Sequence, residues 1–161
     1  MLTKYELWKV PMSETSPKLV SPSWLLERLD DPAITVLEIS SDPEAKAYLK
    51  GHVPGAIFSF WKDLLWHETD REFVSSSELS SRLGEIGVST DSTLVICGDP
   101  VQYGTYALWV MTMAGVKDVR ILDGSRTRWI NDGNPLETEG LSREPIDNGS
   151  LDPSIATRIG R

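Results

Sequence analysis

The sequence predicts an α/β fold with a mostly parallel sheet and helices on both of its faces. Short apolar runs rich in β-branched residues predict strands at 34–39, 57–60, 93–96 and 118–122. Segments with apolar residues at helical spacing lie between these runs. Because strand and helix patterns alternate along the chain, parallel strands joined by crossover helices are the expected architecture.

The helical segments begin and end at recognisable signals. Ser21 and Pro22 predict an N-cap and first residue, and this helix ends before 30–32, which are Asp-Asp-Pro. Ser75 and Glu78 form a capping box ahead of leucines at helical spacing. Further helices are expected at 44–49, from Tyr103 onward and after the Asp-Gly turn at 123–124, with a loop and one helical turn at 61–71.

Length and composition favour one domain that binds neither nucleic acid nor membrane. The chain has 161 residues and a formal net charge of −8, which opposes binding to nucleic acid or anionic membranes. No apolar run approaches the ~20 residues of a membrane span, and the N-terminus lacks a signal-peptide pattern. The single cysteine excludes an intrachain disulfide and a cysteine-cluster zinc site, and it favours a cytoplasmic location.

The single cysteine, Cys97, follows directly on the predicted strand 93–96. A loop is expected at 98–102 and a helix from Tyr103 onward. Ligands of open α/β sheets bind outside the carboxyl ends of the strands, and a helix N-terminus there lowers a thiol's pKa. A lone cysteine at a strand end can equally be a small buried apolar residue, so both interpretations stay open.

Three segments resemble the rhodanese family in the family's own order. Residues 48–57 resemble its early signature, residues 94–97 the strand that delivers its catalytic cysteine, and residues 119–124 with Trp129 its closing strand, turn and helix. The resemblance implies a three-layer fold with a central, mostly parallel five-stranded sheet and helices on both faces. The corresponding division of the chain is an extension at 1–19, a rhodanese-like domain at 20–135 and a linker or C-terminal tail at 136–161.

The match is nearest to the first domain of two-domain thiosulfate sulfurtransferases. Residues 71–74 and 106–109 carry this likeness, and 142–145 resembles the linker that leads into a second domain. In such proteins the first domain usually lacks the cysteine, and the second performs the chemistry. The implied macromolecular partner is a second rhodanese domain or another copy of the chain.

The family resemblance also implies a reaction. A small anionic sulfur donor such as thiosulfate would pass its outer sulfur to Cys97, and cyanide or a thiol would take it from the resulting persulfide. No cofactor and no metal ion are implied. The residues expected to bind the substrate are those of the following loop: Gly98, Asp99, Val101, Gln102 and Tyr103.

The loop departs from the family's pattern in three ways. Gln102 brings no charge where the family commonly has arginine, Asp99 adds a negative charge, and Pro100 removes one N–H donor. Asp99 would raise the pKa of the Cys97 thiol if its carboxylate pointed inward. The alternative function is therefore a weakly active or inactive module that packs on a catalytic domain or another protein. A cysteine-dependent phosphatase is disfavoured, because Tyr103 stands where its arginine would lie.

Four other polar side chains are secondary candidates. Glu38 ends the first predicted strand and either faces the site or bonds to backbone at the turn, the second being favoured. His52 is expected to support the turn of the early signature. Arg126 and Arg128 could bring positive charge to a cleft, but a solvated helix face is favoured for both.

Overall fold

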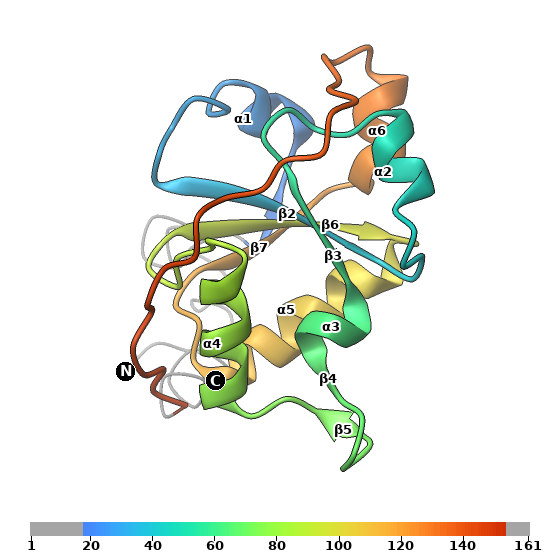
Figure 1. Cartoon of the computed structure of the whole chain (residues 1–161). Coiled ribbons are helices and arrows are strands. Elements are labelled where there is room, and N and C mark those ends of the chain that lie inside the picture. The colour runs from blue at the N-terminus through green and yellow to red at the C-terminus, as the bar shows by residue number, and fades with distance from the viewer. Residues whose placement is uncertain (1–17, 154–161) are drawn as a thin grey trace, which may run out of the picture.

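A computed structural model describes residues 18–153, which form a parallel five-stranded sheet between two layers of helices (Figure 1). The predicted fold class is confirmed. Every neighbouring pair of strands in this sheet is parallel. In spatial order the strands are β1 (Leu19–Val20), β7 (Val119–Leu122), β6 (Thr93–Asp99), β2 (Ile34–Ser40) and β3 (Ile57–Phe60).

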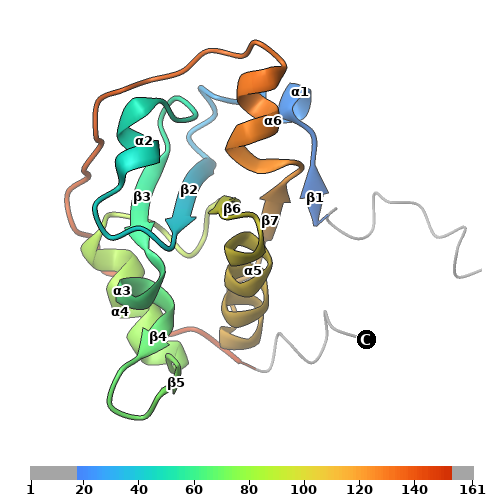
Figure 2. The ribbon, with the colours of Figure 1, turned by 90° about the vertical axis from the view of Figure 1, so that its right-hand side faces the viewer.

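Helices cover both faces of the sheet, and Figure 2 shows the two layers on either side of it. Each layer closes over its own apolar cluster, so the central strands β2 and β6 are buried on both faces. This explains their nearly continuous apolar runs. One layer holds α1 (Pro22–Leu26), α2 (Lys46–Lys50) and α6 (Ser125–Asn131); the other holds α3 (Trp61–Leu65), α4 (Ser76–Glu85) and α5 (Gln102–Ala114).

The predicted helix starts are confirmed by their caps. The Ser21 hydroxyl accepts a hydrogen bond from Trp24 N at 3.1 Å, and the Ser75 hydroxyl accepts one from Glu78 N at 3.3 Å. Each contact satisfies an amide that the first turn of a helix cannot pair. Burial of the apolar side of each short helix against the sheet then supplies most of its stability.

The predicted bounds of β2 and β7 differ by one residue from those observed, and two larger differences concern β6 and β1. β6 runs to Asp99 instead of ending at 96, because residues 97–99 continue the ladder with β2. β1 is an additional edge strand of two residues whose pairing partner, β7, lies about a hundred residues away in sequence. Sequence periodicity carries no signal for either feature, since both depend on strand neighbours. Beyond the helical turn of α3, a hairpin of β4 (Trp66–His67) and β5 (Glu72–Phe73) replaces the expected loop.

The described part of the predicted linker, up to residue 153, is an extended strap along the domain. In Figure 1 it passes from α6 across the molecule to α4. Glu137 pairs with His52 through two backbone hydrogen bonds of 2.9 Å, and Ile146 N donates to Gly84 O at 2.8 Å. Gly87, with φ +75°, admits this approach, because a Cβ there would lie 2.5 Å from Arg143 Cβ. Whether the domain itself ends at 135 stays a prediction.

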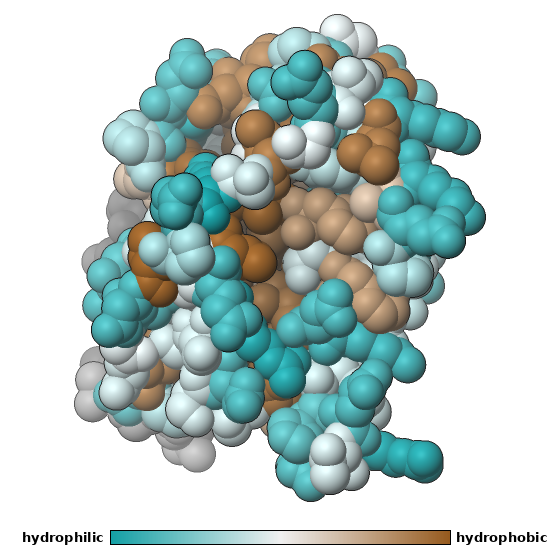
Figure 3. Space-filling model, viewed as in Figure 1, coloured by the Kyte–Doolittle hydropathy of each residue, from teal (hydrophilic) through white to brown (hydrophobic). Residues whose placement is uncertain are grey.

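The surface over β3 is hollowed, and Figure 3 shows apolar atoms in the middle of this face with hydrophilic atoms around them. β3 is an edge strand of the sheet. No helix in the described range, residues 18–153, has the length and apolar character that crossing a membrane requires.

Candidate functional site

The candidate site lies at the carboxyl edge of the sheet, where β2, β6 and β7 end together because they are parallel. Position 38 of β2 is in register with position 97 of β6, so Glu38 and Cys97 project from the same face of the sheet. Arg126 lies in the first turn of α6, the helix that follows β7, and its side chain reaches Glu38. The topology therefore brings together Glu38, Cys97, Asp99 and Arg126, which are far apart in the chain.

Cys97 is a buried residue of the apolar cluster beneath α1, α2 and α6, with an exposed fraction of 1%. Two further strand residues separate it from the loop. Burial raises the pKa of the Cys97 thiol well above its ordinary value, the neighbouring Glu38 raises it further, and Arg126 lowers it. The environment therefore favours the neutral thiol over the nucleophilic thiolate.

The loop after β6 folds onto itself. Tyr103 N donates to Pro100 O and Gly104 N donates to Val101 O, both at 3.0 Å. Pro100, which follows a cis peptide bond, has no N–H to offer. Three of the amides that could converge on an anion are therefore missing or already paired within the loop.

Gly98 is the position from which a side chain would enter this loop. A Cβ at residue 98 would lie 2.2 Å from Gly104 N and 2.7 Å from Val101 O, distances at which backbone would have to move. The Gly98 carbonyl accepts a hydrogen bond from the Ser125 hydroxyl at 2.7 Å. Backbone atoms thus occupy the interior of the loop, and α6 holds in place the strand residue Gly98 just before it.

An ion-pair cluster of three side chains closes the edge of the site. Arg126 Nε lies 3.1 Å from Glu38 Oε1, and Arg126 Nη2 lies 2.8 Å from Asp99 Oδ2. Burial raises the pKa of Glu38 from 4.5 to about 7; Arg126 opposes this rise and Asp99 adds to it. The second oxygen of Glu38, Oε2, is buried and has no hydrogen-bond partner among residues 18–153.

Several expectations for charged residues need correction. Arg126 does not lie on a solvated helix face, because its guanidinium is held between two carboxylates. Glu38 bonds to that guanidinium and not to backbone at the turn. Asp99 also pairs with Arg126, and the acid that raises the pKa of Cys97 is Glu38. Arg128 is half-exposed as expected and pairs with Asp123.

The remaining predicted loop residues do not gather around the thiol. Val101 and Gln102 are exposed, and Tyr103 is half-buried with its ring centroid 5.6 Å from that of Trp61. Their role in substrate binding stays a prediction. Arg126 was missed as a partner of the loop, although its place directly after the Asp-Gly turn that follows β7 puts it at the same sheet edge as β6.

His52 has the structural role that was expected. It is fully buried, its ring stacks on Tyr48 at 3.7 Å between centroids, and its Nδ1 lies 2.7 Å from the Tyr48 carbonyl. Within residues 18–153, no group of three or more His, Cys, Asp or Glu side chains could hold a metal ion.

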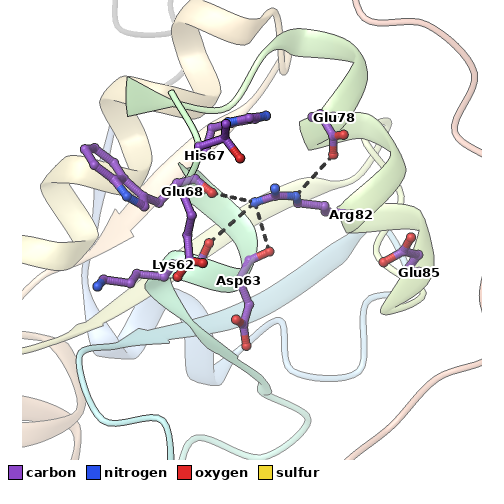
Figure 4. A pocket seen from close by; sticks show the side chains of 9 residues that line it. Lys62, Asp63, His67, Glu68, Glu78, Arg82 and Glu85 are labelled. Atoms are coloured by element: carbon purple, nitrogen blue, oxygen red, sulfur yellow. Dashed lines mark hydrogen bonds and ion pairs between the residues drawn. The ribbon is translucent and has the colours of Figure 1, made fainter. Parts of the chain in front are cut away.

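A second hollow, a pocket of about 470 Å³, lies between α3, α4 and the β4–β5 hairpin (Figure 4). Arg82 reaches across it from α4 and donates to the carbonyls of Asp63 and Trp66 at 3.2 and 2.9 Å. These are carbonyls of the last turn of α3 and its end, so Arg82 acts as a cap for that helix. We therefore interpret this pocket as part of the packing of α4 against α3.

Comparison with known proteins identifies the family. The model of the rhodanese-like domain matches residues 21–132. The sulfur carrier protein TtuD of Thermus thermophilus is 38% identical over 128 residues, which are 79% of this chain and 44% of TtuD. A Mycolicibacterium smegmatis protein named as a thiosulfate sulfurtransferase is 32% identical over 147 residues, or 91% of this chain and 52% of that protein. The chain thus spans about half the length of these relatives.

Solved structures agree on the fold. SseA from Escherichia coli, whose structure is described as a rhodanese fold of 3-mercaptopyruvate sulfotransferases, superposes with a TM-score of 0.69 at 23% identity. The superposition covers 84% of this chain and 56% of SseA. With the family model matching most of the chain, the conclusion is direct: this chain belongs to the rhodanese family.

Proposed function

We propose that this domain is the non-nucleophilic half of a rhodanese-type sulfurtransferase and packs against a second, catalytic domain. The observation that carries the proposal is the burial of the Cys97 sulfur beside Glu38, behind a loop that is filled by its own backbone. A thiol in this environment is poorly ionised and has no open path to a small anion. Relatives about twice as long, with sulfurtransferase or sulfur-carrier names, support the same assignment.

A set of aromatic side chains, two of them exposed and three half-buried against the core, supports packing on a partner. We call it the aromatic face; its rings follow one another from the site loop along α5 with centroid separations of 5.2 to 6.3 Å. Trp109 is 51% exposed and Phe73 is 39% exposed. Aromatic residues are enriched in protein interfaces, where they supply much of the binding energy. The aromatic face consists of Trp61, Phe73, Tyr103, Tyr106 and Trp109.

The second candidate is sulfur transfer by this domain itself. Cys97 is the single thiol of the chain, and it lies near the carboxyl edge of the sheet with Arg126 close by. Its thiolate would attack the outer sulfur of thiosulfate, forming the persulfide and releasing sulfite, and cyanide or a thiol would then remove that sulfur. A reducing compartment, the cytoplasm, suits either function.

Intact-mass analysis after incubation with thiosulfate distinguishes the two functions. We expect no gain of sulfur by the native protein, and no thiocyanate when cyanide is added. Alkylation of Cys97 in urea serves as the control that the thiol is intact. A gain of one sulfur that the Cys97→Ser variant loses would overturn the first proposal and establish the second.

A further inference from the structure

Arg126 is the positively charged side chain at the edge of the site, and two of its nitrogens are paired with acids of its own chain. Glu38 Oε1 approaches Nε at 3.1 Å, and Asp99 Oδ2 approaches Nη2 at 2.8 Å. We propose that the Asp99 carboxylate occupies an anion-binding site formed by Arg126, so that the charge of Asp99 excludes small sulfur oxyanions from this loop.

Solvent accessibility singles out Asp99 as the group that an anion would replace. The Asp99 side chain is 32% exposed, whereas the Glu38 side chain is 1% exposed. Asp99 stands at the end of β6, where the loop begins, and its carboxylate takes the outer position on the guanidinium. A dianion that arrived from solvent would meet Arg126 from the same side, because Glu38 blocks the inner side.

The charges of the cluster explain why the native site is closed. With both acids ionised, two carboxylates and one guanidinium leave a net charge of −1. Residues 98–103 contain no basic side chain to offset it. An incoming dianion therefore meets like charge at close range, which costs binding free energy. Replacing Asp99 by the isosteric asparagine brings the net charge to zero and leaves Arg126 with a neutral acceptor on its outer side, which an anion can displace more easily than a carboxylate.

Glu38 keeps Arg126 in position when Asp99 is neutralised. It is buried on β2, and the ionisable groups around it are Arg126, Asp99, Cys97 and Tyr48. Burial raises the pKa of Glu38, and the Asp99 charge adds to that rise, so Glu38 in the Asp99→Asn variant takes up its proton at a lower pH than in the native protein. The cluster then gains one positive unit, so anion binding to the Asp99→Asn variant should strengthen toward low pH.

Titration with sodium sulfate and sodium thiosulfate, followed by 1H–15N NMR, tests the proposal. Ionic strength is held constant with sodium chloride, because exposed charges are screened by salt. We expect Asp99→Asn to bind both anions at least about tenfold more tightly than the native protein. The shifts should appear at the amides of 98–102 and at Arg126 Nε, and Asp99→Asn/Arg126→Gln should lose the gain.

Asp123→Asn is the matched control, since it removes an acid from an arginine on the same helix. Its partner Arg128 is half-exposed and keeps Asp132 at 3.7 Å, so we expect native affinity. Equal affinities of the native protein and Asp99→Asn would overturn the proposal. A gain that survives in the double variant, or that Asp123→Asn reproduces, would do the same.

Thermal unfolding establishes that each variant is folded, and Asp99→Ser takes the place of asparagine if that variant is not. The proposal concerns anion binding and not sulfur transfer; it uses the proposed function only in choosing the anions. A domain that transfers no sulfur can therefore still bind anions more tightly when Asp99 is replaced. Equally, a domain that does transfer sulfur can fail to show this gain, so the two proposals fail independently.

Discussion

Glu38 is the residue whose environment departs furthest from what its type leads one to expect. Its carboxyl group is 1% exposed in the middle of a parallel sheet; one oxygen pairs with Arg126, and the other has no hydrogen-bond partner in the described part of the chain. Burial of a charge costs more than one ion pair returns here, which is why its pKa rises to about 7 despite the arginine. The place of Glu38 at the end of a strand was predictable from the sequence. Its pairing with Arg126 was not, because it depends on α6 lying next to the ends of β2 and β6.

This environment predicts how stability depends on pH. The pKa of Glu38 is higher in the folded chain, so the folded state holds this proton more tightly than the unfolded state does. The stabilisation that this proton provides is fully present below pH 4.5 and is lost as the pH rises through about 7. The loss in the free energy of unfolding is on the order of 3 kcal/mol. Glu38→Gln should remove most of this loss in urea unfolding measured from pH 4.5 to 8. The exposed Glu44→Gln should retain it; identical pH profiles for native protein and Glu38→Gln would contradict the assignment.

The strap is the element that the sequence describes least well. Its residues are polar, with proline and glycine and little periodicity, which is typical of a linker. In the structure the strap lies along the surface of the domain because polar groups of the domain form hydrogen bonds with it. The backbone pairing of His52 with Glu137 is one example. Such long-range polar contacts have no local pattern in the chain, so only the folded arrangement shows them.

Asn148 is the side chain that anchors the strap to α4 and the turn beyond it. Its Nδ2 donates to Ser80 O and Val88 O at 3.2 and 2.9 Å, and its Oδ1 accepts from Thr90 N at 3.1 Å. Asn148→Ala leaves those partners unsatisfied and should lower the free energy of unfolding by about 2–3 kcal/mol in urea denaturation. Ser150→Ala, at an exposed position of the strap, should change it by less than about 0.5 kcal/mol. Equal effects of the two substitutions would show that Asn148 is not an anchor.

At the scale of the whole molecule, the aromatic face exposes two large apolar rings, those of Trp109 and Phe73. When such a surface lacks its partner, association between copies of the chain buries part of it. We expect concentration-dependent dimers in sedimentation equilibrium, and Trp109→Ser should weaken them at least about tenfold by removing a half-exposed ring from the face.

The control for this prediction is Ile130→Ser, which alters an apolar side chain of α6 that is 40% exposed and outside the aromatic face. It should leave the dimers unchanged. A protein that stays monomeric at millimolar concentration would contradict self-association through this face. Dimers weakened equally by both substitutions would place the contact elsewhere.

The sequence by itself determined the fold class, the main strands, the two capped helices and the family, because these depend on local periodicity, capping and short motifs. It also located Cys97, the loop that follows β6 and the three positions at which that loop differs from the family's pattern. Tertiary structure alone decided that the Cys97 sulfur is buried, that Gly98 faces a filled loop, and that Arg126 joins Glu38 to Asp99. Those properties depend on which strands are neighbours and which faces the helices cover, and residues almost ninety positions apart leave no pattern of that kind in the chain.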